Sequence, residues 1–454
     1  MKNCHELIEA LMPQMTSTLQ GWIRIPSIKA EPAEGAPFGL EARRALDQAL
    51  ADAESLGFAV RNFDGYAGDA RIGPEGVNPL GILVHLDVVP VGTGWAHDPF
   101  GAEIVGDKMY GRGTADDKGP AAAALYAIYA YVKAGLPLNR EIRLIFGCDE
   151  ESGMTCMEHY AQVCDMPETG FSPDASFPLI NTEKASLQLT LHGDYAGGGL
   201  PILQIDVGER RNVIPGEAKA LLAGTGYQAK VAEIAEKYSF QVTAAEKDGN
   251  TEILSVGIPG HAAYPEGCRN ALGQLMIVLR DLGAAQPISA IADRIGIDTS
   301  GSLLGVACSD ETSGPLTCNL GILRYNPQEG LFATLDLRCP MLSNLDKLTE
   351  VIQHSLGDSV RVEIASKRAA HHVSPHSKLV QSLLRAYHEE TGLPAVAEST
   401  GGGTYAHTLK EGVAFGCCFP GEPDMCHQAN EYASLEELKI SMKVFARALK
   451  LLNT

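Results

Sequence analysis

The sequence predicts an α/β fold with a mostly parallel central sheet, interrupted by an inserted α+β domain. Apolar strands alternate with helices up to about residue 181 and again after residue 372, which is typical of a parallel sheet covered by helices. Between these parts, apolar and polar positions alternate as in half-buried antiparallel strands. We therefore expect a discontinuous domain of residues 1–181 and 372–454. The inserted domain would span 182–371, long enough for two subdomains.

The elements of the first part follow from periodicity and from residues that end helices. Residues 4–22 have the spacing of an amphipathic helix that ends before Pro26, and residues 40–56 form a second helix stopped by Gly57. Short apolar runs at 80–86 and 142–146 predict buried strands, and the Ala-rich stretch 118–134 predicts a helix between them.

The inserted domain and the last part are assigned in the same way. In the inserted domain, we expect strands at 187–192, 202–207, 252–256 and 331–338 and helices at 226–239 and 270–283. In the last part, we expect helices at 376–391, 404–410 and 434–451 and strands at 395–399 and 415–419.

Composition and charge exclude several classes of protein. The chain has 454 residues, of which 45% are hydrophobic and 20% are charged, so it is globular. Its net charge of −20 repels phosphate backbones, so we expect no nucleic-acid partner. We also expect no membrane span, because no run approaches ~20 apolar residues. Eleven scattered cysteines and the lack of a visible secretory signal predict a cytoplasmic protein with reduced thiols.

Two segments place acids and a histidine where predicted strands end, which is where ligands bind in open α/β sheets. His85 closes one strand, and Asp87 could accept a hydrogen bond from its ring and leave the other nitrogen for a metal. Asp149, Glu150 and Glu151 follow the next strand, and three adjacent acids repel one another unless a cation is near. The alternatives are a helix-capping aspartate and solvated loop acids.

Three further segments complete the set. Asp116 and Asp117 precede the Ala-rich helix, where they could aim a carboxylate into a cleft or simply cap the helix. Asp174 lies between two prolines, as a turn residue also would, and His427 precedes the last helix. Together the segments offer imidazoles and carboxylates but no cysteine, a donor set that suits zinc, cobalt or manganese at a catalytic site.

These segments together resemble a known family. The motifs HLDVVP, GRGTADDKGP, GCDEESG, SPDASFP and CHQANEY are similar, in this order, to those of the co-catalytic zinc peptidases that include carboxypeptidase G, succinyl-diaminopimelate desuccinylase, aminoacylase and the carnosinases. They look most like PepV-type bacterial dipeptidases. The resemblance implies hydrolysis of the amide bond of dipeptides that have a free amino end and a free carboxylate. It implies two zinc ions, which cobalt or manganese could replace.

The resemblance also implies a role for each residue of the set. Its metal ligands would be His85 and Asp174 on one zinc, Glu151 and His427 on the other, and Asp116 between both. Glu150 would be the general base, and Asp87 would orient His85.

The inserted domain resembles the lid of that family. The resemblance implies that His261 donates a hydrogen bond to the oxyanion. It implies that Asn212 and Arg338 bind the carboxylate of the substrate, as the backbone amides of Gly402 and Gly403 could. The alternatives are an ordinary loop histidine, an ion pair of Arg338 with Asp336, and a plain tight turn of glycines.

Other readings of the chain stay open. Within the family, it could be an N-acyl-amino-acid amidohydrolase, a desuccinylase or a glutamate carboxypeptidase. A dinuclear phosphoesterase and a non-catalytic binding protein are further alternatives. We expect a small peptide as partner and a monomer, with a homodimer as the alternative.

Overall fold

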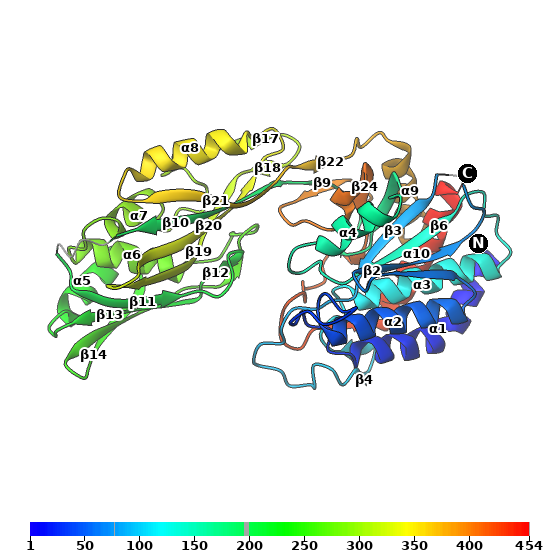
Figure 1. The fold of residues 1–454 in the computed structure, drawn as a ribbon, viewed down its shortest axis with the longest axis horizontal. Helices are drawn as coiled ribbons and strands as arrows, with labels where there is room; N and C mark the ends of the chain where they lie inside the picture. Colours follow the sequence, from blue (N-terminus) through cyan, green and yellow to red (C-terminus); the bar gives the residue numbers. More distant parts are fainter. Residues whose placement is uncertain (77, 195–198, 454) are drawn as a thin grey trace. The chain divides into compact units, whose positions relative to one another are not determined.

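A computed structural model describes residues 1–76, 78–194 and 199–453. The chain divides into two compact units (Figure 1). The first unit consists of Met1–Asn181, Val373–Glu398 and Gly403–Thr454, and the second of Thr182–His372 and Ser399–Gly402. None of the described helices combines the length and the apolar composition that crossing a bilayer requires.

The first unit is built on a sheet whose central strands are parallel. Its strands follow the spatial order β1 (Ala59–Phe63), β2 (Ala67–Ile72), β6 (Ile142–Gly147), β3 (Leu80–His85), β7 (Thr169–Ser172) and β24 (Glu411–Ala414), after which comes β9 (Ile180–Glu183). The pairs β6–β3, β3–β7 and β7–β24 are parallel, whereas β1, β2 and β9 pair in antiparallel fashion. This confirms the predicted mostly parallel sheet.

Helices cover both faces of this sheet because successive side chains of a strand point to opposite faces. A Cβ on Gly68 of β2 would touch Leu50 of α2 (Leu40–Ser55), whereas the next residue, Asp69, accepts a hydrogen bond from Tyr160 of α4 (Thr155–Val163). The other helices are α1 (Lys2–Ile23), α3 (Lys118–Lys133), α9 (Lys378–Thr391), α10 (Leu435–Leu452) and a 3-10 helix, Tyr405–Thr408. Small extra strands are β4 (Glu103–Val105), β5 (Lys108–Tyr110), β8 (Ala175–Ser176), β25 (Cys417–Cys418) and β26 (Tyr432–Ser434).

Helix α3 runs through the core of this unit. Residues 119–128 are buried along its whole circumference, which fits their composition of alanine and bulky apolar residues. By contrast, α9 and α10 are amphipathic and begin at serine caps, Ser377 and Ser434, whose side chains accept from the backbone three residues on.

The second unit is an antiparallel sheet with helices. Its eight strands follow the order β14 (Gln241–Lys247), β15 (Asn250–Val256), β13 (Glu217–Ala223), β11 (Ile202–Val207), β19 (Thr317–Asn326), β20 (Gly330–Cys339), β10 (Ala185–Gly193) and β21 (Arg361–Arg368). Its helices are α5 (Gln228–Tyr238), α6 (Ala271–Asp281), α7 (Ile288–Arg294) and α8 (Leu345–Leu356). Short strands are β12 (Val213–Ile214), β16 (Gly260–His261), β17 (Ser309–Asp310) and β18 (Gly314–Pro315). Two further short strands, β22 (His371–His372) and β23 (Glu398–Thr400), pair with β9 in the first sheet.

Three predictions near the end of the chain were wrong in extent. The helix expected at 404–410 is only a 3-10 turn, and the strand expected at 415–419 lies earlier, at Glu411–Ala414. Gly416 has a φ of 92°, which breaks the extended backbone before Cys417–Cys418. The strand expected at 395–399 comprises only Glu398–Thr400.

Candidate metal centre

Neighbouring parallel strands of the first unit deliver four of the predicted residues to one edge of the sheet. His85 is the last residue of β3, which lies between β6 and β7 and runs parallel to both. Glu150 and Glu151 follow β6, and Asp174 follows β7. Because parallel strands end at the same edge, these side chains converge.

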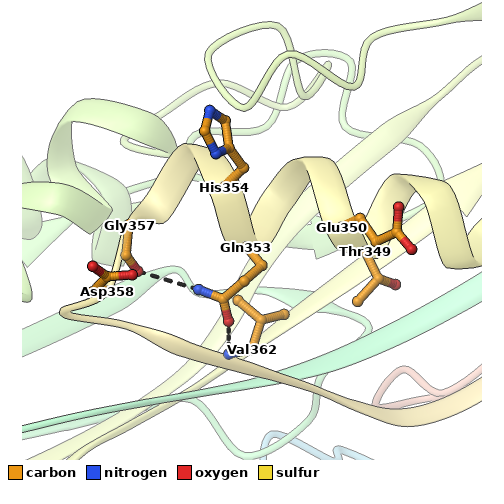
Figure 2. Close-up of a pocket in the computed structure, with 7 residues that line it drawn as sticks. All are labelled: Thr349, Glu350, Gln353, His354, Gly357, Asp358 and Val362. Carbon is orange, nitrogen blue, oxygen red and sulfur yellow. Dashed lines mark hydrogen bonds between the residues drawn. The ribbon is translucent and has the colours of Figure 1, made fainter.

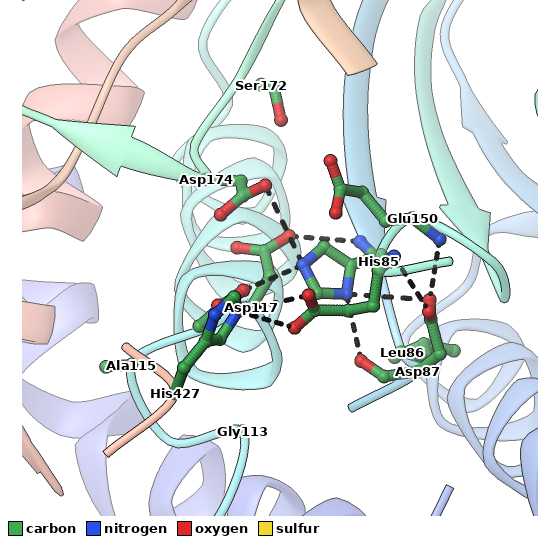
Figure 3. A network of polar contacts seen from close by, with 12 residues as sticks. His85, Leu86, Asp87, Gly113, Ala115, Asp117, Glu150, Ser172, Asp174 and His427 are labelled. Carbon is green, nitrogen blue, oxygen red and sulfur yellow. Dashed lines mark hydrogen bonds and ion pairs between the residues drawn. The ribbon is translucent and has the colours of Figure 1, made fainter. Parts of the chain in front are cut away.

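Asp116 joins this edge from the loop before α3 and faces two histidines. Its Oδ1 lies 2.9 Å from Nε2 of His85, and its Oδ2 lies 3.1 Å from Nε2 of His427. His427 has a φ of 65°, in the left-handed region, in the segment that leads to β26. Figure 3 shows His85 and His427 approaching from opposite sides of this network. One carboxylate therefore stands between two imidazoles.

Two groups of donor atoms share this carboxylate. One group is His85, Asp116 and Asp174, and the other is Asp116, Glu151 and His427; within each group the donor atoms lie within 4.8 Å of one another. Asp174 Oδ2 is 3.7 Å from His85 Nε2, and Glu151 Oε2 is 3.0 Å from His427 Nε2. Nitrogen and oxygen donors at this spacing fit divalent cations. The structure thus brings all five predicted ligands together.

The protonation of the centre shows why it favours cations. Burial alone would lower the pKa of His427, but its hydrogen bonds to Asp116 and Glu151 raise it to about 11. The pKa of the fully buried His85 is likewise raised, because the carboxylates of Asp116 and Asp87 outweigh burial. Burial and the neighbouring Asp116 raise the pKa of Asp174 to about 7. Without a cation, protons therefore balance the crowded negative charge.

Glu150 belongs to neither donor group. Burial and the nearby Asp174 raise the pKa of its carboxyl well above the ordinary value, and among the described residues no hydrogen bond engages that carboxyl. Figure 3 shows Glu150 beside His85 and Asp174. A buried carboxyl with a raised pKa in a cluster of titratable groups is a candidate for acid–base chemistry.

Asp87 differs in detail from the prediction. Nδ1 of His85 bonds to the backbone oxygen of Asp87 at 2.9 Å, whereas the nearest carboxylate oxygen is 3.6 Å away. Instead, the carboxylate accepts the backbone N–H groups of Glu150 and Glu151, each at 3.1 Å. Asp87 therefore holds the loop that carries the predicted base and one ligand.

The sequence did not predict the structural role of Asp117. It precedes α3 but makes no capping hydrogen bond there; its Oδ2 accepts the backbone N–H of His85 at 3.0 Å. Its Oδ1 is buried with no hydrogen-bond partner among the described residues. Glu431 and Arg112, which form a buried ion pair, were also missed. The signal for them was weak, since a lone glutamate before a helix is common.

The predicted substrate residues, apart from Gly403, lie in the second unit. His261 in β16 pairs with Val213 in β12, and the backbone oxygen of Asn212 accepts from the N–H of Ala262 at 2.8 Å. The N–H of Ala263 donates to Nδ1 of His261. Gly403 belongs to the first unit.

Arg338 is fixed by its own neighbours. Nε and Nη2 donate to the two oxygens of the fully buried Asp336, at 2.6 and 3.1 Å, and Nη1 donates to the backbone oxygen of Gly401 at 2.8 Å. The ion pair with Asp336, considered from the sequence as an alternative, therefore exists, and it holds Arg338 beside Gly401.

A separate cavity of about 690 Å³ lies in the second unit beside α8 (Figure 2). Gln353 at its centre bonds to the backbone of Gly357 and Val362, closing the end of its own helix. No member of either donor group lines it. It is a surface groove of the helix end and not part of the metal centre.

Comparison with known proteins gives one family. The model of "Peptidase family M20/M25/M40" matches residues 81–451. "Putative dipeptidase YtjP" of Bacillus subtilis is 36% identical over 449 residues, which cover 95% of each chain. A "Putative dipeptidase" of Staphylococcus aureus strain MW2 is 32% identical over 462 residues, covering 98% of each chain.

Solved structures share the fold. Human carnosine dipeptidase 1 superposes with a TM-score of 0.65 at 16% identity, covering 100% of this chain and 98% of that one. The di-peptidase Dug1p of Saccharomyces cerevisiae gives 0.64 at 14% identity with the same coverage.

Proposed function

This chain belongs to peptidase family M20/M25/M40, and from that membership and the geometry of the centre we propose that it is a di-zinc dipeptidase. The membership confirms the family inferred from the sequence motifs. The observation that carries the proposal is the position of Asp116, whose two oxygens face His85 and His427 at 2.9 and 3.1 Å. A carboxylate shared in this way is the core of co-catalytic two-metal sites.

We propose that His85 and Asp174 hold one zinc ion, that Glu151 and His427 hold the other, and that Asp116 serves both. When bound, the two cations would polarise the scissile carbonyl and acidify a water molecule. The residues present fit them, because each donor group combines an imidazole with two carboxylates and no cysteine. Cobalt or manganese would suit the same donors.

Glu150 is the general base and acid of this proposal. Its carboxyl is outside both donor groups, and its backbone is fixed by Asp87. It would take a proton from the attacking water and later deliver it to the leaving amine. Its pKa, raised by burial and by the nearby Asp174, supports a role in proton transfer.

The second unit would bind the substrate ends, as a lid. His261 would donate to the oxyanion, and Asn212, Arg338 and the amides of Gly402 and Gly403 would receive the carboxylate. Arg338 still has N–H groups left beyond its bonds to Asp336 and Gly401. The relatives' names, "Putative dipeptidase", support dipeptides as the substrate class.

The test is a panel of substrates assayed with zinc-loaded protein. We expect hydrolysis of free dipeptides and much slower hydrolysis of their N-acetylated and C-amidated forms, because each modification removes a charged end. Preferential hydrolysis of N-acyl amino acids would instead assign the chain to amidohydrolases of the same family. Zinc-loaded protein that cleaves no member of the panel would refute an enzymatic function.

We also propose a monomer that works in the cytoplasm. All the cysteines of the chain are free thiols in the structure, which supports a reducing compartment. Sedimentation at assay concentration tests the oligomeric state.

A further inference from the structure

The carboxylate of Glu431 is buried where two ligand-bearing segments meet. Glu431 has no exposed surface and follows His427 by four residues. Its Oε1 accepts backbone N–H groups of Gly113, Ala115 and Asp116 at 3.0, 2.9 and 3.3 Å. One oxygen thus accepts three backbone N–H groups of the loop that ends in the shared ligand Asp116.

The other side of Glu431 is fixed as firmly. Its Oε2 accepts from Nη1 of Arg112 at 2.6 Å, and its backbone oxygen accepts from the N–H of Gly111 at 2.9 Å. Arg112 is 2% exposed, lies over the ring of Trp95, and also donates to the backbone oxygen of Gln428. Charge-assisted hydrogen bonds of this kind are short and directional, so they define geometry as well as energy.

These contacts tie two ligands to one another. Asp116 carries its carboxylate on the loop that Glu431 holds, and His427 lies on the segment to which Glu431 and Gln428 belong. The separation of Asp116 Oδ2 from His427 Nε2, 3.1 Å, therefore depends on this junction. Residues behind metal ligands commonly set ligand orientation and metal affinity.

We infer that Glu431 is a positioning residue of the metal centre, which sets Asp116 against His427 so that one carboxylate can serve two cations. The inference rests on the proposed function only in requiring that the centre binds metal. The alternative is that Glu431 and Arg112 are a buried ion pair that contributes to folding alone.

A glutamine at position 431 separates these roles. Its amide has a single acceptor oxygen, so it cannot accept from both Arg112 and the three N–H groups. The matched control is Asp69→Asn, because Asp69 is also unexposed and binds Arg71 through both oxygens. Asp69 lies within β2 and belongs to neither donor group.

The experiment measures metal affinity on the full chain by competition with a zinc chelator, together with the visible absorption of cobalt-substituted protein and the melting temperature without metal. We expect Glu431→Gln to bind zinc about 10–100-fold more weakly and to show an altered cobalt spectrum. We expect Asp69→Asn to keep the affinity within about twofold, although both variants melt at lower temperature. No peptide is involved, so the result is independent of whether dipeptides are the substrates.

Parental zinc affinity and an unchanged cobalt spectrum in Glu431→Gln, with a melting temperature lowered as in the control, would overturn the inference. If Glu431→Gln does not fold, Glu431→Asp takes its place. It keeps the charge but is one methylene shorter, so it cannot reach Arg112 and the loop together. The same loss of affinity is expected for it, and parental affinity would overturn the inference equally.

Discussion

Replacing Glu150 by glutamine tests the assignment of the base most directly. Gln has nearly the same shape and can keep the backbone contact with Asp87, which involves only the N–H of residue 150. What it loses is the ability to accept a proton. Because the Glu150 carboxyl is outside both donor groups, the metal ligands stay in place.

The expected effect on catalysis is large. A positioned acid–base group contributes ~10²–10⁴ in rate, or about 2.8–5.6 kcal/mol of barrier at ~1.4 kcal/mol per decade. We therefore expect kcat to fall by about that factor with KM nearly unchanged, since Glu150 is not proposed to bind either substrate end.

The same substitution should lower activity but raise the stability of the metal-free protein relative to the parent as pH increases. Burial raises the folded-state pKa of Glu150, so folding binds a proton there, and this favourable contribution is lost as pH rises through the folded pKa. Glutamine is neutral at every pH. Metal-free Glu150→Gln should therefore be as stable as the parent at acid pH and gain on it as pH increases.

The assay combines steady-state hydrolysis of a dipeptide, zinc content and thermal unfolding between pH 5 and 8. A lower melting temperature together with a lower zinc content in Glu150→Gln would show that Glu150 supports the fold and not the chemistry. Hydrolysis at more than about a tenth of the parental kcat with zinc bound would refute its role as base.

Three other outcomes follow. Zinc binding should release at least about two protons near neutral pH, and affinity should rise with pH. The raised pKa values of His85 and His427 mean that both imidazolium groups must lose a proton to bind metal, and Asp174, whose pKa is raised to about 7, adds part of a third. Calorimetry in buffers of different ionisation enthalpy measures this release, and no buffer dependence would contradict it. His261→Gln should lower kcat by about 10²–10³ with little change in zinc content, as expected for loss of one oxyanion donor; an unchanged kcat would remove His261 from the mechanism. Gly147→Ala should destabilise the first unit by about 1–3 kcal/mol, because its Cβ would lie 2.2 Å from the hydroxyl of Tyr405; denaturant unfolding tests this, and parental stability would contradict it.

The sequence predicted the sheet edge well because short apolar runs mark buried parallel strands. Residues 80–86 and 142–146 match β3 and β6 within one residue at each end. His85 ends β3, and Glu150 and Glu151 lie in the loop after β6. Strands of the second unit such as β13 and β14 were missed. Their residues include many exposed polar and alanine positions, so alternation alone did not distinguish them from loops.

The contacts of Asp87 show where periodicity stops being informative. The expected contact with the ring of His85 assumed that the strand continues through residue 87, so that both side chains share a face. The strand ends at His85, and the Asp87 carboxylate turns to the amides of Glu150 and Glu151. Tertiary neighbours of this kind leave no local pattern. The same holds for Glu431, whose partners lie more than 300 residues earlier in the chain.

The proposed catalytic and substrate-binding residues belong to different units of the chain. Every proposed metal ligand and Glu150 lie in the first unit, whereas His261, Asn212 and Arg338 lie in the second. Arg338 is held by Asp336 and Gly401, and Asn212 by Ala262, all within the second unit. Each set is therefore positioned by contacts of its own unit. Under the role proposed for Arg338, substitutions around it should alter which substrate carboxylate is accepted and leave the donors around Asp116 in place, because the contacts that hold each set lie within one unit in the described part of the chain.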